Sequence, residues 1–325
     1  MRIGIIGCGL IGQKRAASVE RRHRIVGVAD LDRGKAEALA ARTGAAAATE
    51  WREVVDQKPD IVVVAVTHDR LAEIAAGAAA AGCHVLVEKP GARSEAELRP
   101  VAEAAAASGV RVKVGFNHRF HPAFLKARAL VDAGIAGPLM YIRGRYGHGG
   151  RLGYEREWRM QRELSGGGEL IDQGAHLIDL ARWFLGDFTS VDGWVPTYYW
   201  PVEVDDNCFM ALRTGAGQMA WLHATWTEWK NCFSFEICGR DAKLEINGLG
   251  GSYGTERLTL YKMLPELGPP ETTIWEYPFP DRSFDLETAE FVAAIEQGRA
   301  PIGDIEDGLA MLRVVDRIYQ GTKSK

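Results

Sequence analysis

The sequence predicts a two-part α/β protein. Residues 1–120 would form a doubly wound parallel sheet, and residues 121–325 an α/β domain with a large, mostly antiparallel sheet. In the first part, short apolar runs alternate with alanine-rich helical stretches, which is typical of a parallel sheet covered by helices. Between residues 189 and 278, strand-like segments follow one another across glycine-containing or charged turns, which is typical of antiparallel strands.

The elements of the first part follow in chain order from these patterns. The run Asp60–Val66 is almost wholly apolar, as expected of a central parallel strand covered on both faces. The alanine run 45–48 is interpreted as helix or loop filler. We predict strands at 2–6, 24–29, 60–66, 84–87 and 111–115, and helices at 10–20, 33–42, 70–81 and 94–108.

The second part begins with helices and continues with strands. A helix is predicted at 122–134, and apolar residues at helical spacing predict another near 169–185. Two helices are expected to end the chain, near 284–297 and 304–320. The turns that separate the intervening strands are predicted at 214–217, 239–241 and 247–248.

Length and composition exclude several classes of protein. The chain has 325 residues, which is enough for two domains, and its net charge of −4 without a basic block gives no support for nucleic-acid binding. No apolar run approaches a membrane span, and no signal peptide precedes the first strand. The five cysteines show neither CxxC pairs nor zinc-like spacing, so we expect reduced thiols, no metal site and a cytoplasmic location.

The apolar run at residues 3–6 leads directly into Gly7-Cys8-Gly9-Leu10-Ile11-Gly12. If a strand ends here and a helix begins, Gly7 makes the tight turn, Gly9 lets the backbone approach a pyrophosphate, and Gly12 lets helix and strand pack closely. The free N–H groups at the helix amino end then face the phosphates. The motif predicts a bound dinucleotide; the alternative is a glycine turn that serves packing alone.

A second strand ends at Asp30, 18 residues after Gly12. This spacing suits a carboxylate that binds the adenosine ribose hydroxyls. Because a carboxylate repels a 2′-phosphate, we predict NAD in preference to NADP, although Arg33 nearby could soften the preference. The alternative is a solvated turn residue.

Val85-Leu86-Val87-Glu88-Lys89-Pro90 places a charged pair at the end of a parallel strand, which is the ligand-facing edge of the sheet. A lysine there can donate a hydrogen bond to a substrate hydroxyl or to the nicotinamide ribose, and a cis peptide at Pro90 would aim it inward. The alternative is a surface Lys–Glu pair of little energetic value.

Asp172 and His176 follow a glycine run, 166–168, and their spacing of four places them on one helical face. The glycines would let the backbone pass close to a ligand. An imidazole with an acid one turn away can act as a general base near neutral pH. The alternative is a capped helix start with a structural histidine.

At these residues the chain resembles the Gfo/Idh/MocA oxidoreductases, the relatives of glucose–fructose oxidoreductase and inositol dehydrogenase. The resemblance spans the chain and rests on the glycine loop, Glu88-Lys89-Pro90, residues 115–120, Trp158-Arg159, residues 166–179 and the pattern from Phe291 to Asp307. It implies a Rossmann domain followed by an α/β domain with a large sheet. It departs from the family pattern at Thr67–Leu71, which lacks the usual Thr-Pro, and at His118, where arginine or tyrosine is frequent.

The resemblance also implies roles for single residues. The catalytic set would be Lys89, Asp172 and His176. Cofactor contacts would come from Gly7, Gly9, Leu10, Ile11, Gly12, Asp30, Thr67, Glu88, Lys89 and Asn117. Substrate contacts would come from Lys89, Arg119, Tyr146, Trp158, Arg159, Asp172 and His176.

Two clusters bear on substrate and partners. Residues 143–162 contain six arginines, which favours an anionic polyol (a nucleotide-linked sugar, sugar phosphate or uronic acid); a solvated loop or a subunit contact is the alternative. A second cluster is aromatic and favours a buried subunit interface over sugar stacking: Trp194, Tyr198, Tyr199, Trp200, Trp221, Trp226 and Trp229. The family resemblance implies that this association is a homodimer or a homotetramer.

The expected function is NAD-dependent hydride transfer to or from a secondary alcohol or ketone of a sugar, an acidic or nucleotide-linked sugar derivative, or a cyclitol. Two other classes stay open. One is a redox-neutral NAD-dependent glycosidase, in which the hydride returns to the substrate. The other is a non-catalytic NAD-binding regulator, which would have no need of Lys89, Asp172 and His176.

Overall fold

The structure is a computed structural model that describes residues 1–19 and 22–322. Contacts group these residues into two compact units, the first made of residues 1–116 and 284–312, and the second of residues 117–283 together with those from 313 onward. The sequence division at residue 120 assigned 284–312 to the second domain. In the structure this segment belongs to the first unit, because Phe291 is buried there in one core with Ile3 and Ile5.

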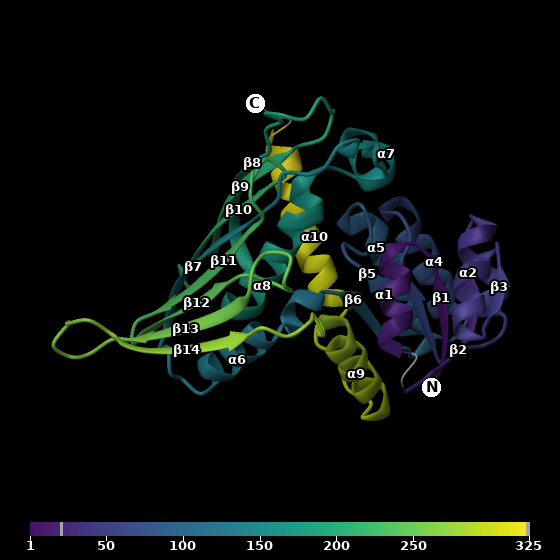
Figure 1. Ribbon diagram of the computed structural model, residues 1–325, viewed down its shortest axis with the longest axis horizontal. Coiled ribbons are helices and arrows are strands. Elements are labelled where there is room, and N and C mark those ends of the chain that lie inside the picture. The colour runs from purple at the N-terminus through teal and green to yellow at the C-terminus, as the bar shows by residue number, and fades with distance from the viewer. Residues whose placement is uncertain (20–21, 323–325) are drawn as a thin grey trace. The chain divides into compact units, whose positions relative to one another are not determined.

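Within the described residues, the first unit contains a six-stranded sheet in the order β3-β2-β1-β4-β5-β6 (Figure 1). Every neighbouring pair of strands is parallel, so the predicted doubly wound sheet is confirmed. The strands are β1 (Arg2–Ile6), β2 (Arg24–Ala29), β3 (Ala46–Ala48), β4 (Ile61–Val64), β5 (His84–Glu88) and β6 (Val112–Gly115). The strand order changes direction between β1 and β4, which is where ligands bind in sheets of this kind.

Strand β3 falls on the alanine run that we interpreted as helix or loop filler, and that interpretation is wrong. Its three alanines pair in parallel with residues 27–29 of β2. Alanine has the highest helix propensity, so the local sequence gives no strand signal. Pairing with the edge of the sheet overrides this weak preference. The short helix α3 (Trp51–Val55) was also not predicted.

The predicted helices are present with ends shifted by at most two residues; the predicted end of the first helix, residue 20, lies outside the described residues. Several are capped as their sequences indicate: Asp32 accepts the N–H of Lys35 at the start of α2, and Ser94 accepts that of Glu97 at the start of α5. The helices of the first unit are α1 (Leu10–Val19), α2 (Arg33–Thr43), α4 (His68–Ala80), α5 (Glu95–Ser108), α9 (Ser283–Glu296) and the first part of α10 (Ile305–Thr322).

The second unit is built on a sheet whose described strands number eight, in the order β14-β13-β12-β11-β7-β10-β9-β8. Only β7 and β10 pair in parallel, so the predicted antiparallel character is confirmed. β7 (Leu139–Gly147) was not predicted, although it lies in the middle of the sheet. The other strands are β8 (Phe188–Trp194), β9 (Asn207–Thr214), β10 (Met219–Thr225), β11 (Cys232–Gly239), β12 (Ala242–Asn247), β13 (Glu256–Lys262) and β14 (Glu271–Tyr277).

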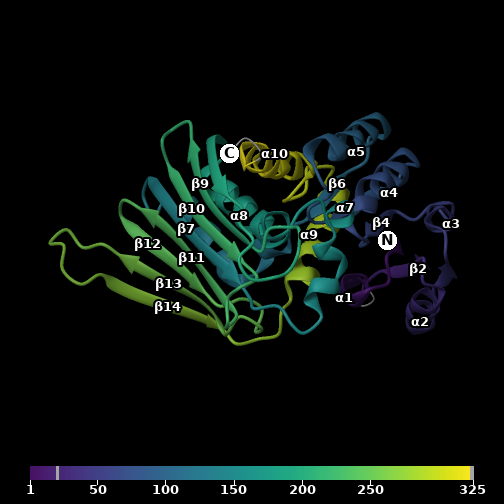
Figure 2. The same cartoon turned by 90° about the horizontal axis from the view of Figure 1, so that it is seen from above.

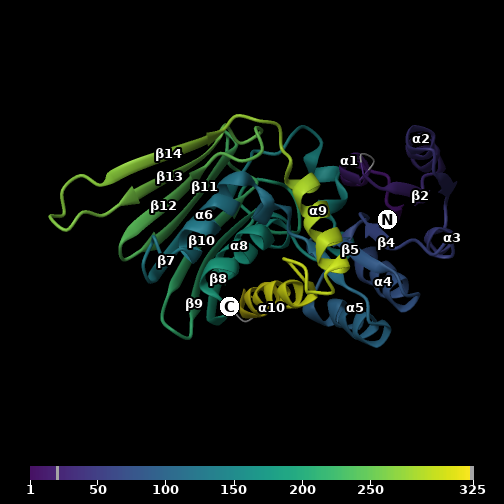
Figure 3. The same cartoon turned by 90° about the horizontal axis from the view of Figure 1, so that it is seen from below.

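Helices α6 (Pro122–Asp132) and α8 (Ala175–Leu185), with the last part of α10, cover one face of this sheet, as Figures 2 and 3 show from opposite sides; a Cβ on Gly193 of β8 would meet Ile318 of α10. α6 packs on β12–β14, and α8 packs on β7 and β10. The other face is open, with Trp221 of β10 and Trp194 of β8 about half exposed. Among the helices of the described residues, none combines the length and hydrophobicity needed to cross a membrane.

Candidate functional site

The glycine loop has the strand–turn–helix form that its sequence predicts. Gly7 has a positive φ of 95°, and a Cβ there would collide with the carbonyl oxygen of Ala65. A Cβ on Gly12 would collide with the carbonyl oxygen of Gly7. At Gly9, by contrast, an added Cβ would meet no protein atom within 4 Å. The protein itself therefore requires the outer two glycines, and the middle one suits the close approach of a ligand.

Asp30 lies beside this loop at the end of β2. Its Oδ2 accepts the backbone N–H of Cys8 at 2.7 Å, and its Oδ1 accepts that of Asp32 at 2.9 Å. Burial, with the charge of Asp30 as a smaller contribution, raises the pKa of Cys8 to about 12. The thiol therefore stays protonated at neutral pH and is not a nucleophile. Both the loop and the carboxylate fit the adenosine half of a dinucleotide.

The other predicted cofactor residues of the first unit lie at helix and strand ends. Leu10 and Ile11 begin α1, and Thr67 precedes α4 without a side-chain capping bond. Lys89 is half-buried and follows β5 directly, and the Lys89–Pro90 peptide is cis, as the sequence suggested. Glu88 is engaged within the protein, because the guanidinium of Arg15 contacts its carboxylate at 2.6 Å.

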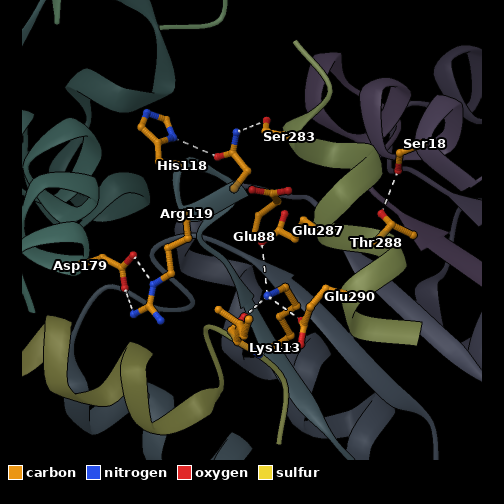
Figure 4. A network of polar contacts seen from close by, with 12 residues as sticks. Ser18, Glu88, Lys113, His118, Arg119, Asp179, Ser283, Glu287, Thr288 and Glu290 are labelled. Carbon is orange, nitrogen blue, oxygen red and sulfur yellow. Dashed lines mark hydrogen bonds and ion pairs between the residues drawn. The ribbon is translucent and has the colours of Figure 1, made fainter. Parts of the chain in front are cut away.

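Arg15 belongs to a buried charge cluster that the sequence reasoning missed. Its Nη1 lies 2.6 Å from Glu287 of α9. Lys113 of β6 lies 3.7 Å from the same carboxylate and 3.6 Å from Glu290 (Figure 4). Burial raises the pKa of Glu88 above its ordinary value, against the opposing effect of Arg15. The signal that could have indicated this cluster is Lys113 within the apolar strand β6, since a buried charged side chain is almost always paired.

In the second unit, the predicted helix 169–185 is not uniform. Residues Leu170–Gly174 form a π-helical turn that carries Asp172, and α8 then begins at Ala175 with His176 in its first turn. π-helical turns inside helices occur frequently at functional sites. Both side chains are buried, and the chain geometry at Asp172 differs from the simple α-helical face that the spacing predicted.

The glycine run before this turn has a different role from the one predicted. A Cβ on Gly167 would collide with the hydroxyl of Tyr319, and one on Gly168 with the backbone of Asp205. Asp205 in turn accepts the N–H groups of Gly168 and Leu170. These glycines are therefore required by packing within the unit, and they give no evidence of a ligand.

Aromatic rings surround His176. The ring of His118 stacks on it with centroids 3.7 Å apart and planes inclined by 18°, and Tyr146 of β7 lies 6.3 Å from it. Tyr146 also contacts His118 at 5.4 Å and Tyr253 at 5.1 Å. Burial raises the pKa of Tyr146 well above its ordinary value, so its hydroxyl stays protonated. Thus the second unit brings together the candidate site residues His176 and Tyr146, and adds His118 and Tyr253 to the group.

Asp172 has a cationic neighbour on the preceding loop. The Nε of Arg159 lies 3.3 Å from Oδ2 of Asp172, and its Nη1 lies 3.6 Å from Glu157. The guanidinium also lies over the ring of Trp158, 4.7 Å from its centroid. The structure thus brings the predicted residues Trp158, Arg159 and Asp172 into one group.

Two predicted site residues are held by other contacts. Arg119 is almost fully buried and binds Asp179 of α8 through two hydrogen bonds of 2.6 and 2.9 Å (Figure 4). Because the guanidinium of Arg119 binds Asp179 within the fold, we do not propose Arg119 as a substrate contact. The amide nitrogen of Asn117 donates to the hydroxyl of Ser283 at 2.9 Å, and its amide oxygen lies 3.2 Å from Nδ1 of His118. The contact of Asn117 with the cofactor stays a prediction.

Comparisons with known proteins agree with these two units. Residues 1–116 match the family model described as an oxidoreductase family with an NAD-binding Rossmann fold, and residues 124–245 match the GFO/IDH/MocA C-terminal domain. The chain belongs to the GFO/IDH/MocA oxidoreductase family. Its first unit is accordingly an NAD-binding Rossmann domain.

Relatives of this oxidoreductase act on sugars. It is 31% identical over 228 residues to a levoglucosan dehydrogenase of Pseudarthrobacter phenanthrenivorans, a match that spans 61% of this chain and only 58% of that protein. It is 26% identical to the D-glucoside 3-dehydrogenase of Escherichia coli, across 100% of this chain and 96% of that one. A levoglucosan dehydrogenase solved with NADH and L-sorbose shares the fold, with a TM-score of 0.89 at 23% identity over 100% of this chain and 97% of that chain.

The arginine-rich stretch of this family member does not form one surface. Arg143 and Arg145 lie on the exposed side of β7, whereas Tyr146 is buried. Four of the six arginines are paired with carboxylates, in the pairs Arg143–Glu236, Arg151–Glu157, Arg156–Glu155 and Arg159–Asp172. Because neighbouring residues of a strand face opposite sides of the sheet, β7 separates Arg143 and Arg145 from Tyr146. The sequence analysis did not predict this strand.

The aromatic cluster divides in the same way. Trp226 is fully buried in a small core with Tyr154, Met160 and Val204. Trp200 is partly buried and packs against the same core. The other five are exposed to different degrees, on the open face of the sheet or on the loops beside it: Trp194, Tyr198, Tyr199, Trp221 and Trp229.

Asp30→Asn tests the role of Asp30 in cofactor choice. The amide keeps an acceptor for the N–H of Cys8 and removes the charge that would repel a 2′-phosphate. We expect the ratio of kcat/KM with NAD to that with NADP to fall about tenfold or more. Asp56→Asn is the control, since Asp56 is an exposed carboxylate of the same unit. An unchanged ratio in Asp30→Asn would remove this role.

Proposed function

We propose that the protein is an NAD-dependent dehydrogenase or reductase that interconverts a secondary alcohol and a ketone on an uncharged sugar or cyclitol. The observation that carries the proposal is the buried imidazole of His176, which follows a π-helical turn holding Asp172 in a chain whose other unit is an NAD-binding domain. Such an imidazole can exchange a proton with a hydroxyl group near neutral pH.

The residues beside the glycine turn would hold the dinucleotide: backbone N–H groups at the start of α1 for the pyrophosphate and Asp30 for the adenosine ribose. The chemistry that NAD supplies when bound is hydride transfer at its nicotinamide ring. Oxidation of a secondary alcohol releases a hydride from carbon and a proton from oxygen. His176 takes that proton during oxidation and returns it during reduction.

Other side chains tune this proton exchange. We assign Asp172 to the stabilisation of the His176 imidazolium, and the guanidinium of Arg159, 3.3 Å away, holds that carboxylate. We also assign Lys89 to the substrate oxygen, where an ammonium group would stabilise developing negative charge. The assignment of Lys89 comes from the Glu-Lys-Pro motif, and its test is the loss of turnover in Lys89→Met with unchanged NAD binding.

The pairing of the arginines favours an uncharged substrate. The six arginines of the stretch 143–162 suggested an anionic polyol, but most of these guanidinium groups already have carboxylate partners. An anionic substrate would have to displace those partners. Hydroxyl groups need no such exchange, and the levoglucosan and D-glucoside named for two of the matched dehydrogenases are neutral.

A substrate panel tests the function. The protein is mixed with NAD and with levoglucosan, methyl glucoside, myo-inositol, glucose 6-phosphate, glucuronate or a nucleotide-linked sugar, and nicotinamide absorbance is followed. We expect stoichiometric NADH formation with at least one neutral polyol. Activity confined to the charged sugars would overturn the neutral-substrate proposal. Bond cleavage without any absorbance change would identify the redox-neutral glycosidase instead.

We also propose that the protein is a cytoplasmic homo-oligomer. The exposed Trp194 and Trp221 on the open sheet face support self-association, since large exposed aromatics often mark contacts. The cysteines of the described residues are free thiols, which supports a reducing compartment. A strictly monomeric mass in sedimentation would contradict the oligomer.

A further inference from the structure

The stack of His118 on His176 is a contact between two imidazoles from distant parts of the second unit. His118 belongs to a short 3-10 helix, Asn117–Phe120, and His176 to the first turn of α8. Their centroids are 3.7 Å apart and both side chains are buried. At this separation the two ring faces are in van der Waals contact over most of their area.

His118 is itself held in place. Its Nδ1 lies 3.2 Å from Oδ1 of Asn117, whose Nδ2 donates to Ser283 at 2.9 Å (Figure 4). Because an amide oxygen can only accept, Nδ1 of His118 carries a proton. Three further rings contact its edges and faces, those of Tyr146 at 5.4 Å, His121 at 5.5 Å and Phe233 at 6.3 Å. The ring of His118 is therefore a fixed plane.

A fixed plane against His176 restricts how that ring can turn. Rotation about its Cβ–Cγ bond would drive one ring edge into His118, so the two planes must stay nearly parallel. The lone pair of an imidazole nitrogen lies in the ring plane. The stack consequently fixes the plane in which His176 can accept a proton, and proton transfer is sensitive to such alignment.

We propose that His118 is a positioning residue for His176, which acts by presenting a flat ring rather than by its own basicity. The proposal rests on the proposed function, in which His176 exchanges the substrate proton. It accounts for a buried histidine at a position where the family resemblance leads one to expect arginine or tyrosine. A tyrosine could present the same flat face, whereas an aliphatic side chain could not.

Paired variants test the flatness of the ring. His118→Phe keeps a planar ring, and His118→Leu removes it at similar volume. With NAD and levoglucosan, or the most active polyol of the panel, we expect His118→Leu to lower kcat by about 10- to 100-fold with KM for the sugar within about threefold. We expect His118→Phe to retain kcat within about fivefold. Phe184→Leu, which removes a ring packed against Trp183 and Phe235 in the same unit, is the packing control.

A spectroscopic arm reads the stack without turnover. In the wild type, the ring protons of His176 should show an upfield ring-current shift in NMR of protein with labelled histidine. The shift should persist in His118→Phe and vanish in His118→Leu. If His118→Leu does not fold, His118→Gln, which also lacks a ring, takes its place in both the kinetic and the spectroscopic comparison.

Each outcome decides the proposal. Equal kcat in the Phe and Leu variants, whether high or low, would show that the flat ring is not what matters and would overturn it. Absence of the ring-current shift in the wild type would do the same. A wild type that is inactive with every polyol would instead overturn the proposed function, and the positioning role with it.

Discussion

His176→Asn is expected to lower kcat for the best polyol by on the order of 10²–10⁴, which is the usual contribution of a general acid–base group. The variant keeps a polar side chain of similar shape but cannot take a proton from the substrate hydroxyl. The residues expected to bind NAD belong to the first unit, so the affinity for NAD, measured by fluorescence titration, should stay within about twofold.

His223→Asn is the matched control for this experiment. His223 comes from the same unit, but it lies on the side of β10 that also carries Met219 and Trp221, stacked on Phe209 with centroids 4.2 Å apart. We expect the variant His223→Asn to keep the kcat of the wild type. Comparable turnover in His176→Asn and His223→Asn would refute the role given to His176.

Arg15→Met is expected to destabilise the protein by about 3–5 kcal/mol, the cost of breaking a buried ion pair by removing one partner. Arg15 has no exposed surface, and its loss would leave the carboxylates of Glu88 and Glu287 facing each other without the guanidinium that contacts both at 2.6 Å. Urea unfolding, followed by circular dichroism, measures the change. Arg33→Ala at the exposed Arg33–Glu37 pair should change stability by less than about 1 kcal/mol.

The loss of unfolding free energy in Arg15→Met should depend on pH. Burial already raises the pKa of Glu88 above its ordinary value of 4.5, so ionisation of Glu88 opposes folding, and Arg15 is the group that counteracts this. An acid with a raised folded-state pKa contributes stability below its unfolded pKa and loses it as pH rises through the folded value. The difference between wild type and Arg15→Met should therefore be larger at pH 8 than at pH 5.

A double-mutant cycle completes the test of the buried cluster. In the background of Arg15→Met, the change Glu287→Gln removes one of the two facing carboxylates and should restore part of the lost stability. Additive losses from the two changes, or a deficit independent of pH, would show that the cluster is not electrostatically coupled.

Much of the fold follows from local patterns in the sequence. The glycine loop, the apolar strand Ile61–Val64 and the alternation with capped helices determine the parallel sheet. Where the sequence reasoning failed, local preference and tertiary pairing disagree. Ala46–Ala48 consists of residues that favour helix, but it pairs with the edge of the sheet. In β7 the arginines hid the strand signal, although the strand places them on its exposed side.

The candidate site was predictable only in part. Spacing identified Asp172 and His176, and the structure places them at a π-helical turn and at the start of α8. No pattern indicated that Arg119 would bind Asp179, 60 residues away, or that Gly168 would be required by Asp205. Such contacts join positions distant along the chain, and periodicity carries no information about them.

The sequence by itself determined the class of fold, the dinucleotide loop and the two residue types suited to proton exchange, because these depend on neighbours within one strand–turn–helix unit or one helix turn. Only the tertiary structure decided which charges are buried together, as at Arg15, Glu88 and Glu287, and which ring lies against His176. The physical reason is that burial and pairing are properties of surfaces brought together by folding, and their energies depend on contacts that no single segment contains.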